Sequence, residues 1–142
     1  MSEFESYDGT ALAAAIGAGE MSAREATESA IERIEALNPT LNAVIGTRFE
    51  QALAEVDAGL PAGPLTGVPT LVKALGADVA GLPTTRGSRL WADDVKSADS
   101  ELVRRMKQAG MVVLGTTNTP ELGKSASPEP VLHGPTPNPR DL

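Results

Sequence analysis

The amino-acid sequence predicts an α/β fold in which a mixed sheet is flanked by helices. Apolar residues recur at helical spacing through most of residues 1–62. A strand, a long loop, a helix and a second strand then follow one another within residues 63–119. Such a crossover places the two strands parallel, with the helix packed on the sheet. Residues 120–142 lack both patterns, because six of the 11 prolines lie between Pro120 and Pro139.

The N-terminal part is expected to be mainly helical. The Ala-rich stretch Thr10–Ala18 predicts a short helix that begins near Gly9 or Thr10. Ser22 and Glu25 form a capping-box pattern, in which a hydroxyl and a carboxylate satisfy free amides at the start of a second helix. That helix is expected to end at Asn38–Pro39, because the residue before a proline disfavours the helical conformation.

A short strand and a third helix are expected next. The apolar run Leu41–Gly46 predicts the strand. An apolar stripe at helical spacing then predicts a helix that ends at Gly59, before Pro61. The stripe consists of Phe49, Ala52, Leu53 and Val56.

The following strand leads directly to a lysine. Val68–Val72 is a short apolar run, and Pro69 confines it to a sheet edge or to the start of a strand. Lys73 comes next and precedes a loop rich in Gly and Thr that extends to Ala98. Loops of this length without regular structure are uncommon and often functional. Side chains at strand ends commonly meet ligands, so Lys73 is a candidate functional residue, although a lysine that only extends into solvent is the commoner case.

A helix and a strand complete the crossover. Asp99 is the expected N-cap, Gly110 the expected end of the helix, and Met111–Leu114 the strand. The core-facing stripe is expected to be Leu102, Val103, Met106 and Ala109. The Pro-rich segment 120–142 can supply neither a helix nor a central strand. It is expected to be disordered or to lie against something outside this chain.

Composition and charge exclude several classes of function. The chain has 142 residues with 12 Lys and Arg against 19 Asp and Glu, and its net charge of -7 argues against a general nucleic-acid binder. The absence of Cys excludes disulfides, thiolate nucleophiles and Cys-based metal sites. The N-terminus is acidic where a secretory signal needs positive charge. The longest stretch of low polarity, Ala11–Gly19, is far short of the ~20 residues of a membrane span. A cytoplasmic protein without a membrane interaction is therefore expected.

Several catalytic motifs are absent from the sequence. It contains no phosphate-binding loop, no dinucleotide-binding glycine fingerprint and no nucleophile elbow of the G-x-S-x-G type. A Ser-His-Asp triad or a metal site would have to use His133, the only histidine, which lies in the Pro-rich segment. An ordinary loop histidine is the favoured interpretation.

An ordered series of motifs resembles the amidase signature family and covers nearly the whole chain. The segment Gly63–Lys73 matches the family pattern G-P-L-x-G-[VI]-P-x-x-[VL]-K. The later matching segments are Gly81–Ser88, Ala98–Arg105, Val112–Glu121 and His133–Pro139. The family also usually opens with two helices like those expected at Thr10 and Ser22.

The resemblance implies hydrolysis of small-molecule amides by a Ser–cis-Ser–Lys triad, without a metal or an organic cofactor. On the family pattern, Lys73 is the catalytic lysine. Its neutral amine takes a proton from the nucleophilic serine through the bridging cis-serine, which is a variant of serine–base catalysis. Lowering a lysine pKa from ~10.4 to about 7 requires roughly 4–5 kcal/mol, which desolvation in a closed apolar pocket supplies.

Two other motif segments are expected to have structural roles. The segment Thr84–Ser88 is expected to line the interior near the lysine. Asn118–Glu121 resembles a loop that caps a short helix, with Thr119 at the N-cap and Pro120 at the first helical position.

The sequence departs from the family pattern in two places. The chain ends at Asn138–Leu142, before the G-G-S-S-G-G segment that holds the cis-serine and the later segment that holds the nucleophile. Ser88, Ser125 and Ser127 do not occupy those motif positions. Ala74 stands where members of the family commonly carry Asp or Glu after the lysine.

The resemblance therefore implies the N-terminal fragment of a single amidase domain, with an incomplete sheet. Residues 1–62 are its mainly helical region, 63–119 the strand–loop–helix–strand unit with the catalytic lysine, and 120–142 the tail that leads into the missing part. The chain alone is expected to be inactive, and its incomplete sheet favours self-association. The alternative function is that of a truncated, non-catalytic amidase paralogue that acts as a binding or regulatory module. An unrelated α/β binding domain would require the motif series to be a coincidence.

Overall fold

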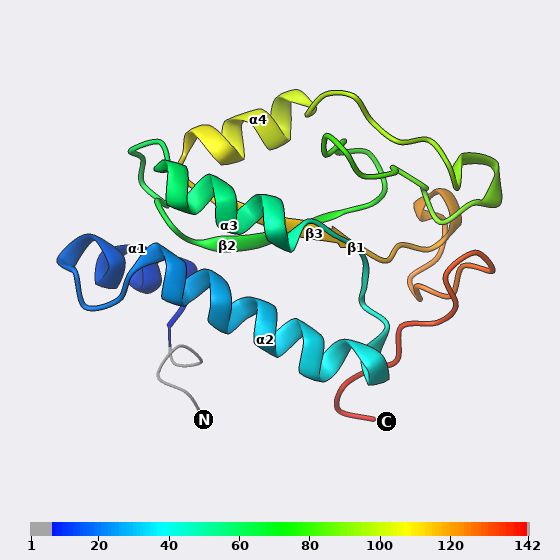
Figure 1. Ribbon diagram of the computed structural model, residues 1–142. Helices are drawn as coiled ribbons and strands as arrows, with labels where there is room; N and C mark the ends of the chain where they lie inside the picture. The colour runs from blue at the N-terminus through cyan, green and yellow to red at the C-terminus, as the bar shows by residue number, and fades with distance from the viewer. Residues whose placement is uncertain (1–6, 142) are drawn as a thin grey trace.

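The computed structural model describes residues 7–141, in which helices lie on both sides of a small sheet (Figure 1). Within these residues the helices and strands are α1 (Gly9–Ala18), α2 (Ala23–Leu41), β1 (Val44–Thr47), α3 (Phe49–Ala58), β2 (Pro69–Lys73), α4 (Glu101–Gln108) and β3 (Val112–Thr117). Two short 3-10 helices, η2 (Arg89–Trp91) and η3 (Glu121–Gly123), lie in the connecting segments. The α/β fold class predicted from the sequence is confirmed.

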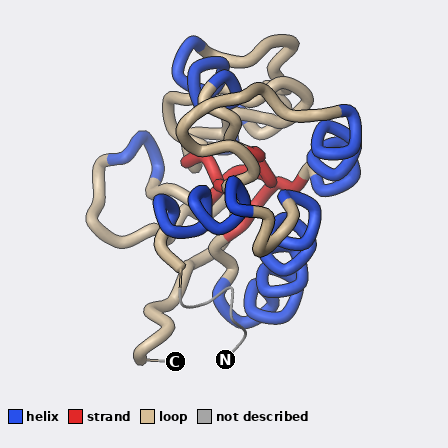
Figure 2. The backbone as a smooth tube through the Cα atoms, turned by 90° about the vertical axis from the view of Figure 1, so that its left-hand side faces the viewer, coloured by secondary structure: helices blue, strands red, loops and turns tan. Residues whose placement is uncertain are grey.

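The sheet is mixed, and its strand order is β1-β3-β2. Figure 2 shows the strands, in red, with helices and loops around them. β2 pairs with β3 in parallel and β1 pairs with β3 antiparallel, so β3 is the central strand. The parallel pair and its crossover through α4 are those expected from the sequence. β2 is an edge strand that begins at Pro69, a position where a sheet tolerates proline. β3 extends to Thr117, beyond the expected end at Leu114, because both neighbours pair with its C-terminal half.

Side chains of β3 alternate between the two faces of the sheet. Val112 and Leu114 belong to a core cluster with α2 and α3, whereas Val113 packs in a second cluster with Val103 of α4. α2 and α3 therefore cover one face and α4 covers the other (Figure 1). Each large aliphatic side chain that is fully buried contributes about 1.5–3 kcal/mol.

Side chains cap the first two helices. The expected capping box of α2 is confirmed, because Ser22 Oγ accepts from the Glu25 amide at 3.1 Å and the Glu25 carboxylate accepts from the Ser22 amide at 2.8 Å. α1 begins at Gly9, as the sequence predicts, and its N-cap is Asp8. The Asp8 carboxylate accepts from two free amides of the first turn, at 3.0 and 2.8 Å.

The end of α2 differs from the prediction. The helix continues through Pro39 to Leu41, and Asn42 closes it in the left-handed conformation with φ of 49°. The Asn38 side chain stabilises this ending, because it donates to the Val44 carbonyl at 2.8 Å and accepts from two backbone amides next to β1. These bonds outweigh the local preference against a helical residue before proline. β1 consequently begins at Val44, later than the sequence predicts.

The start of α4 also differs from the prediction. Ser100 is the N-cap, whereas the Asp99 carboxylate accepts from a loop amide at 2.8 Å and pairs with Lys107 at 2.8 Å. Asp99 thus ties the preceding loop to the helix. Val103 is fully buried as expected, but Leu102 is 58% exposed because it lies on the solvent side of the helix.

β3 contains an irregularity that Arg48 stabilises. The register with β2 shifts between Val113 and Gly115, so Leu114 is an extra residue on β3. The Val113 carbonyl accepts from Nη1 of Arg48 at 2.8 Å, and the Leu114 carbonyl accepts from the Arg48 amide at 2.9 Å. The Glu55 carboxylate of α3 in turn accepts from both terminal nitrogens of Arg48. One buried arginine therefore satisfies two successive carbonyls that a regular strand would direct to opposite sides.

The Pro-rich segment lies against this chain, which corrects the expectation that it is disordered or packs on something else. Asn42 at the end of α2 and Asn118 after β3 donate to backbone carbonyls of residues 133–135. Figure 1 shows this segment, in red, beside the C-terminal end of α2. Hydrogen bonds between residues far apart in the sequence hold it, and no local pattern predicts such bonds.

Candidate functional site

Lys73 is the last residue of β2 and pairs in register with Thr117, the last residue of β3. The carboxyl ends of the two parallel strands thus meet at one edge of the sheet, where side chains of α/β proteins commonly meet ligands. Lys73 is exposed, whereas Ala74 is fully buried. The Ala74 amide donates to the Thr117 carbonyl at 3.0 Å, and the Ala74 carbonyl accepts from the Arg86 amide at 2.9 Å. The backbone after the lysine is therefore held from two sides.

The burial of Ala74 bears on the departure from the family pattern. An acidic side chain at this position would be buried beside the strand end and would need a hydrogen-bonding partner there. Alanine avoids that cost, and it leaves no acidic side chain directly after Lys73.

The loop of residues 84–88 packs beside the lysine-bearing strand. Thr84, Thr85 and Ser88 are all buried. Gly87 has a φ of 68°, and a Cβ atom there would come within 2.6 Å of the Thr119 carbonyl oxygen. Only glycine permits this close approach of two backbone segments. The loop therefore joins the end of β2 to the segment that follows β3.

Charged and aromatic side chains close the outer part of the same loop. The Arg86 guanidinium lies 4.9 Å from the centroid of the Trp91 ring and 3.6 Å from the Asp94 carboxylate. Lys96 pairs with Asp94 at 2.7 Å, and its hydrogen bond holds the pKa of Asp94 below the ordinary value. Together with η2 and an isolated β-bridge, these contacts order a loop that the sequence predicts to lack regular structure.

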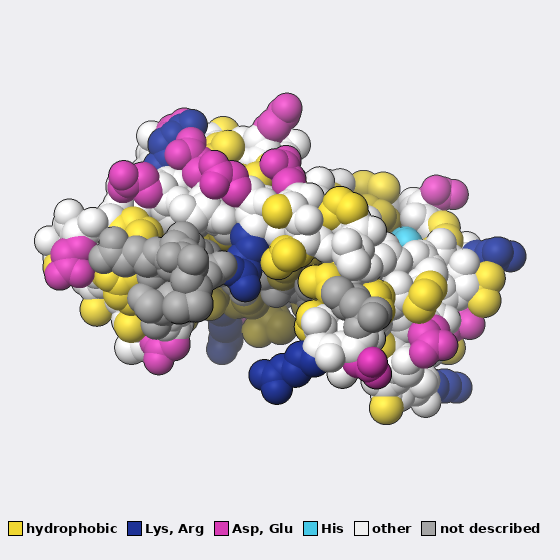
Figure 3. Space-filling model, turned by 90° about the horizontal axis from the view of Figure 1, so that it is seen from below, with side chains coloured by type: hydrophobic (Ala, Val, Ile, Leu, Met, Phe, Trp, Pro, Cys, Tyr) yellow, Lys and Arg dark blue, Asp and Glu magenta, His cyan; other side chains and the backbone are white. Residues whose placement is uncertain are grey.

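The Pro-rich segment reaches the same end of the sheet. Nε2 of His133 lies 3.0 Å from Oγ1 of Thr85, and the Asn118 amide group donates to the Gly134 carbonyl at 3.0 Å. His133 is half-buried, and burial lowers its pKa. The cyan histidine side chain reaches the surface seen in Figure 3. Four of the motif segments found in the sequence, Gly63–Lys73, Gly81–Ser88, Val112–Glu121 and His133–Pro139, therefore converge around the ends of β2 and β3.

Ser88, Ser125 and Ser127 have partners other than Lys73. Ser88 Oγ accepts from the Leu90 amide at the start of η2. Ser125 and Ser127 are exposed in the Pro-rich segment, where the Ser127 hydroxyl donates to the Glu129 carboxylate. Within residues 7–141, no hydroxyl hydrogen-bonds to the Lys73 amine. The described residues therefore place a lysine without a serine partner at this site.

The motif segments include Thr85, Asn118 and His133, but sequence reasoning missed two polar residues that hold the fold together, Asn42 and Arg48. Asn42 gave no signal, because the sequence places it inside the expected strand Leu41–Gly46, whereas the structure places it directly after α2 in the left-handed conformation. Thr119 is not the N-cap expected from the sequence, because Pro120 occupies that position of η3. The Thr119 hydroxyl donates instead to the Pro120 carbonyl at 3.2 Å. Arg48 gives no local signal, since its partners lie on other elements.

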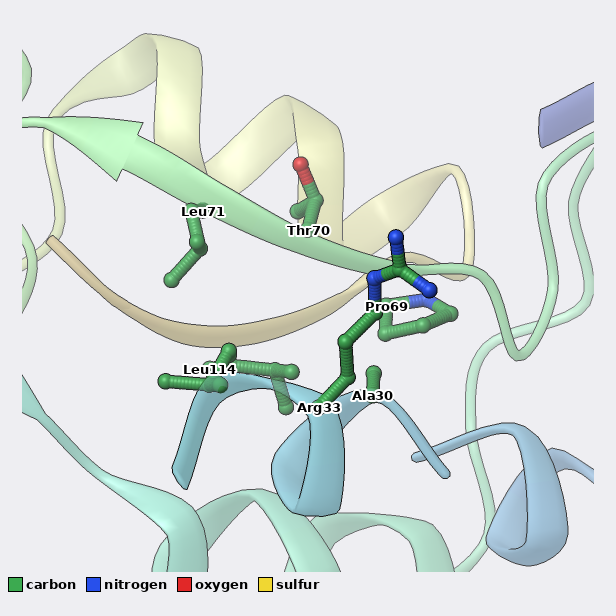
Figure 4. A pocket seen from close by; sticks show the side chains of 7 residues that line it. Ala30, Arg33, Pro69, Thr70, Leu71 and Leu114 are labelled. Atoms are coloured by element: carbon green, nitrogen blue, oxygen red, sulfur yellow. The ribbon is translucent and has the colours of Figure 1, made fainter. Parts of the chain in front are cut away.

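An apolar groove of about 260 Å³ lies between α2 and β2 (Figure 4). It is lined by Ala30, Arg33, Ile34, Pro69, Thr70, Leu71 and Leu114. Figure 4 shows Leu71 and Leu114 in the space between the strand and the helix. The groove follows the open edge of the sheet, and Lys73 does not line it. It is therefore separate from the cluster of motif segments at the strand ends.

Two further properties concern the described part of the chain. Among residues 7–141, no three His, Cys, Asp or Glu side chains are grouped so that they could hold a metal ion. In the same range no helix combines the length and the apolar character that crossing a membrane requires.

Comparison with known proteins shows consistent similarity over almost the whole chain. The Amidase family model matches residues 25–142. A glutamyl-tRNA(Gln) amidotransferase subunit from Alkalilimnicola ehrlichii is 44% identical over 137 residues, which cover 92% of this chain and 28% of the relative. The acylamidase of Rhodococcus erythropolis is 39% identical over 140 residues, which cover 94% of this chain and 29% of the relative.

Solved structures show the same similarity. A structure of 6-aminohexanoate cyclic dimer hydrolase complexed with substrate matches with a TM-score of 0.91 at 37% identity. The match covers 99% of this chain and 29% of that protein. This chain therefore spans less than a third of the length of the relatives that it matches.

Proposed function

This chain belongs to the amidase family, and we propose on that basis that it carries the lysine-bearing part of an enzyme that hydrolyses carboxylic amide C–N bonds. Lys73 is the proposed catalytic residue. The observation that supports this assignment is its position at the carboxyl end of β2, where the segments around Thr85, Asn118 and His133 converge. The proposed substrate is a small-molecule carboxylic amide, and the proposed chemistry requires neither a metal nor an organic cofactor.

The proposed mechanism follows the Ser–cis-Ser–Lys scheme that the motif series implies. The neutral Lys73 amine takes a proton through the bridging serine, and the nucleophilic serine attacks the amide carbonyl carbon. The tetrahedral intermediate collapses when the C–N bond breaks, and the leaving amine receives the proton from Lys73 through the same bridge. Water then attacks the acyl-serine ester in the same way and releases the carboxylic acid.

The exposure of Lys73 supports the proposal that this chain is inactive by itself. A neutral lysine at pH 7 needs a desolvated pocket, and the Lys73 side chain is open to water here. Both serines of the scheme also lie outside the motif segments present in this chain. We therefore expect no hydrolysis of simple aliphatic or aryl amides by the 142-residue chain. Turnover that the substitution Lys73→Ala abolishes would contradict this.

The proposed organisation is one domain in three consecutive parts. Residues 1–62 form the mainly helical region, 63–119 hold the strand–loop–helix–strand unit with Lys73, and 120–142 form the segment that leads toward the remainder of the domain. The open edge of β2 and the apolar groove beside it are the surfaces that the remainder would cover. In the chain alone, these surfaces favour self-association, which sedimentation velocity at several chain concentrations tests.

A second candidate function is that of a truncated, non-catalytic paralogue that binds and regulates a full-length amidase. The open β2 edge and the groove favour it, because a partner strand could add to that edge. This function predicts a stoichiometric complex when the chain is mixed with a full-length amidase of the family. Without such a complex, the second candidate fails and the first remains. The cytoplasmic location, and the absence of nucleic-acid and membrane partners, stay predictions from the sequence.

A further inference from the structure

We infer that Asn42 and Asn118 form a two-amide clamp that positions residues 130–137 against the loop that follows Lys73. Both are positioning residues, since neither touches the lysine amine. The role assigned to the clamp rests on the amidase function proposed above, because residues 130–137 precede the point where the family pattern continues into the serine segments. Both partners of every hydrogen bond in the clamp lie within this chain, so the clamp can be tested without any enzymatic activity.

Asn42 provides the first half of the clamp. Its Nδ2 donates to the carbonyls of His133 at 2.7 Å and Pro135 at 3.1 Å. Its φ of 49° is a conformation that Asn tolerates better than most residues, so one residue both ends α2 and presents an amide to the segment. Its own carbonyl accepts from the Thr136 hydroxyl at 2.7 Å.

Asn118 provides the second half. Its Nδ2 donates to the Gly134 carbonyl at 3.0 Å and to Thr136 Oγ1 at 2.9 Å. Its Oδ1 accepts from the Thr119 amide at 3.0 Å, and this bond fixes which way the amide group points. Asn118 is only 7% exposed, so these bonds are shielded from water. The Thr136 hydroxyl accepts from Asn118 and donates to Asn42, and thereby joins the two halves.

The chemistry of the clamp matches that of the segment it holds. Prolines at 130, 135 and 137 have no amide hydrogen, so the segment offers mainly carbonyl acceptors. A primary amide carries two N–H donors, and each of the two asparagines uses both of them on this segment. Side-chain donors therefore replace the ladder hydrogen bonds that a Pro-rich segment cannot form.

The clamped segment is connected to the lysine strand through one loop. The His133 side chain contacts Thr85, and the next residue, Arg86, donates its amide to the Ala74 carbonyl directly after Lys73. Residues 130–137 thus contact the loop of residues 84–88 through His133. Loss of the clamp should therefore weaken the hydrogen bonds of residues 130–137 directly, and that of the Arg86 amide indirectly.

Amide hydrogen exchange on the 142-residue chain tests the clamp. The reporters in the segment are the amides of Gly134 and Thr136, which donate to backbone carbonyls of the Pro-rich segment at 2.8 and 2.9 Å, and the reporter beside the lysine is the Arg86 amide. The substitution Asn118→Asp keeps the Oδ1 acceptor and the size of the side chain but removes both donors. We expect at least about tenfold faster exchange at all three reporters, with exchange in the β3 core unchanged. Asn42→Asp should have the same effect.

A matched control separates the lost donors from the added charge. Asn138 lies in the same Pro-rich segment, is exposed and uses its Oδ1 only to accept from the Arg140 amide at 3.0 Å, which Asp preserves. Asn138→Asp should therefore leave the three reporters unchanged. Equal acceleration in this control would overturn the clamp, and so would unprotected Gly134 and Thr136 amides in the unaltered chain.

Thr136 offers a second route if an aspartate variant fails to fold. Thr136→Val removes the hydroxyl that joins the two asparagines, whereas Thr136→Ser keeps it. The proposal predicts faster exchange in the valine variant and protection near the unaltered level in the serine variant. Equal exchange in the two variants would overturn it. If hydrogen exchange overturns the clamp, the catalytic role proposed for Lys73 is unaffected. If an activity assay overturns that catalytic role, the clamp is unaffected.

Discussion

The substitution Arg48→Met should lower the free energy of unfolding more than the loss of an exposed arginine does. Methionine retains much of the aliphatic stem but removes the guanidinium, which is buried between β3 and α3. The Val113 carbonyl then loses its guanidinium donor, which lies 2.8 Å away. The Leu114 carbonyl is unaffected, because its donor is the backbone amide of residue 48. The variant therefore leaves one carbonyl of the β3 irregularity unpaired in the interior.

The magnitude follows from the partners that are lost. A hydrogen bond from a charged donor to a buried carbonyl contributes about 1.5–3 kcal/mol. Glu55 is 38% exposed and retains Lys107 at 3.6 Å, so its lost ion pair with Arg48 adds little. The expected loss is therefore about 2–3 kcal/mol of unfolding free energy, with the larger share from the unpaired Val113 carbonyl.

Urea unfolding at one fixed chain concentration measures this loss. With a slope of about 1–3 kcal/mol per molar urea, the midpoint should fall by roughly 1 M or more. Arg104→Met is the matched control, because Arg104 is 51% exposed and pairs with Glu101 on its own helix. It should cost less than about 1 kcal/mol. A loss for Arg48→Met no larger than that of the control would refute the assigned role of Arg48.

Two further predictions concern the sheet and the Pro-rich segment. Gly115→Ala should abolish or severely weaken β1–β3 pairing, at a cost above about 3 kcal/mol, because its Cβ would overlap the Gly46 carbonyl oxygen. Gly76→Ala is the control, because a Cβ atom at Gly76 would meet open space. Unfolding followed by circular dichroism compares the stability of the two variants. Equal stability would contradict the register described for β3. Burial lowers the pKa of His133, so the folded chain binds a proton at this imidazole less readily than the unfolded chain does. The stability that the neutral imidazole contributes is therefore complete above the unfolded pKa of about 6.5, and it is lost as the pH falls through the pKa of the folded chain. An NMR titration of the imidazole C–H signals checks the direction, and a folded pKa above that of the urea-unfolded chain would contradict it.

Local patterns predicted the parts of the fold that local physics determines. The capping box at Ser22 and Glu25 needs only residues three apart, and it forms as predicted. The edge position of β2 followed from Pro69, which a central strand would not tolerate. The family motifs and the structure agree on the α/β class and on the parallel pair that ends at Lys73.

The failures have a common cause, which is hydrogen bonding and ion pairing by polar side chains to residues outside their own element. Pro39 did not end α2, because the Asn38 side chain bonds across to the start of β1. Asp99 did not cap α4, because it serves the preceding loop and Lys107. The Pro-rich segment has almost no local structure-forming signal, and its position depends in part on three hydrogen bonds to Asn42, which lies more than 90 residues away in the sequence. No window along the sequence contains both partners of such a bond.

We propose that Lys73 is the catalytic lysine of an amidase whose remaining parts lie outside this chain. The most direct measurement is amide hydrolysis by a hybrid in which these residues replace the matching 29% of the Rhodococcus erythropolis acylamidase. We predict that the hybrid hydrolyses an acyl amide and that Lys73→Ala slows it by about 100-fold or more. A folded hybrid without activity, or a Lys73→Ala hybrid that hydrolyses at the same rate, would contradict the claim.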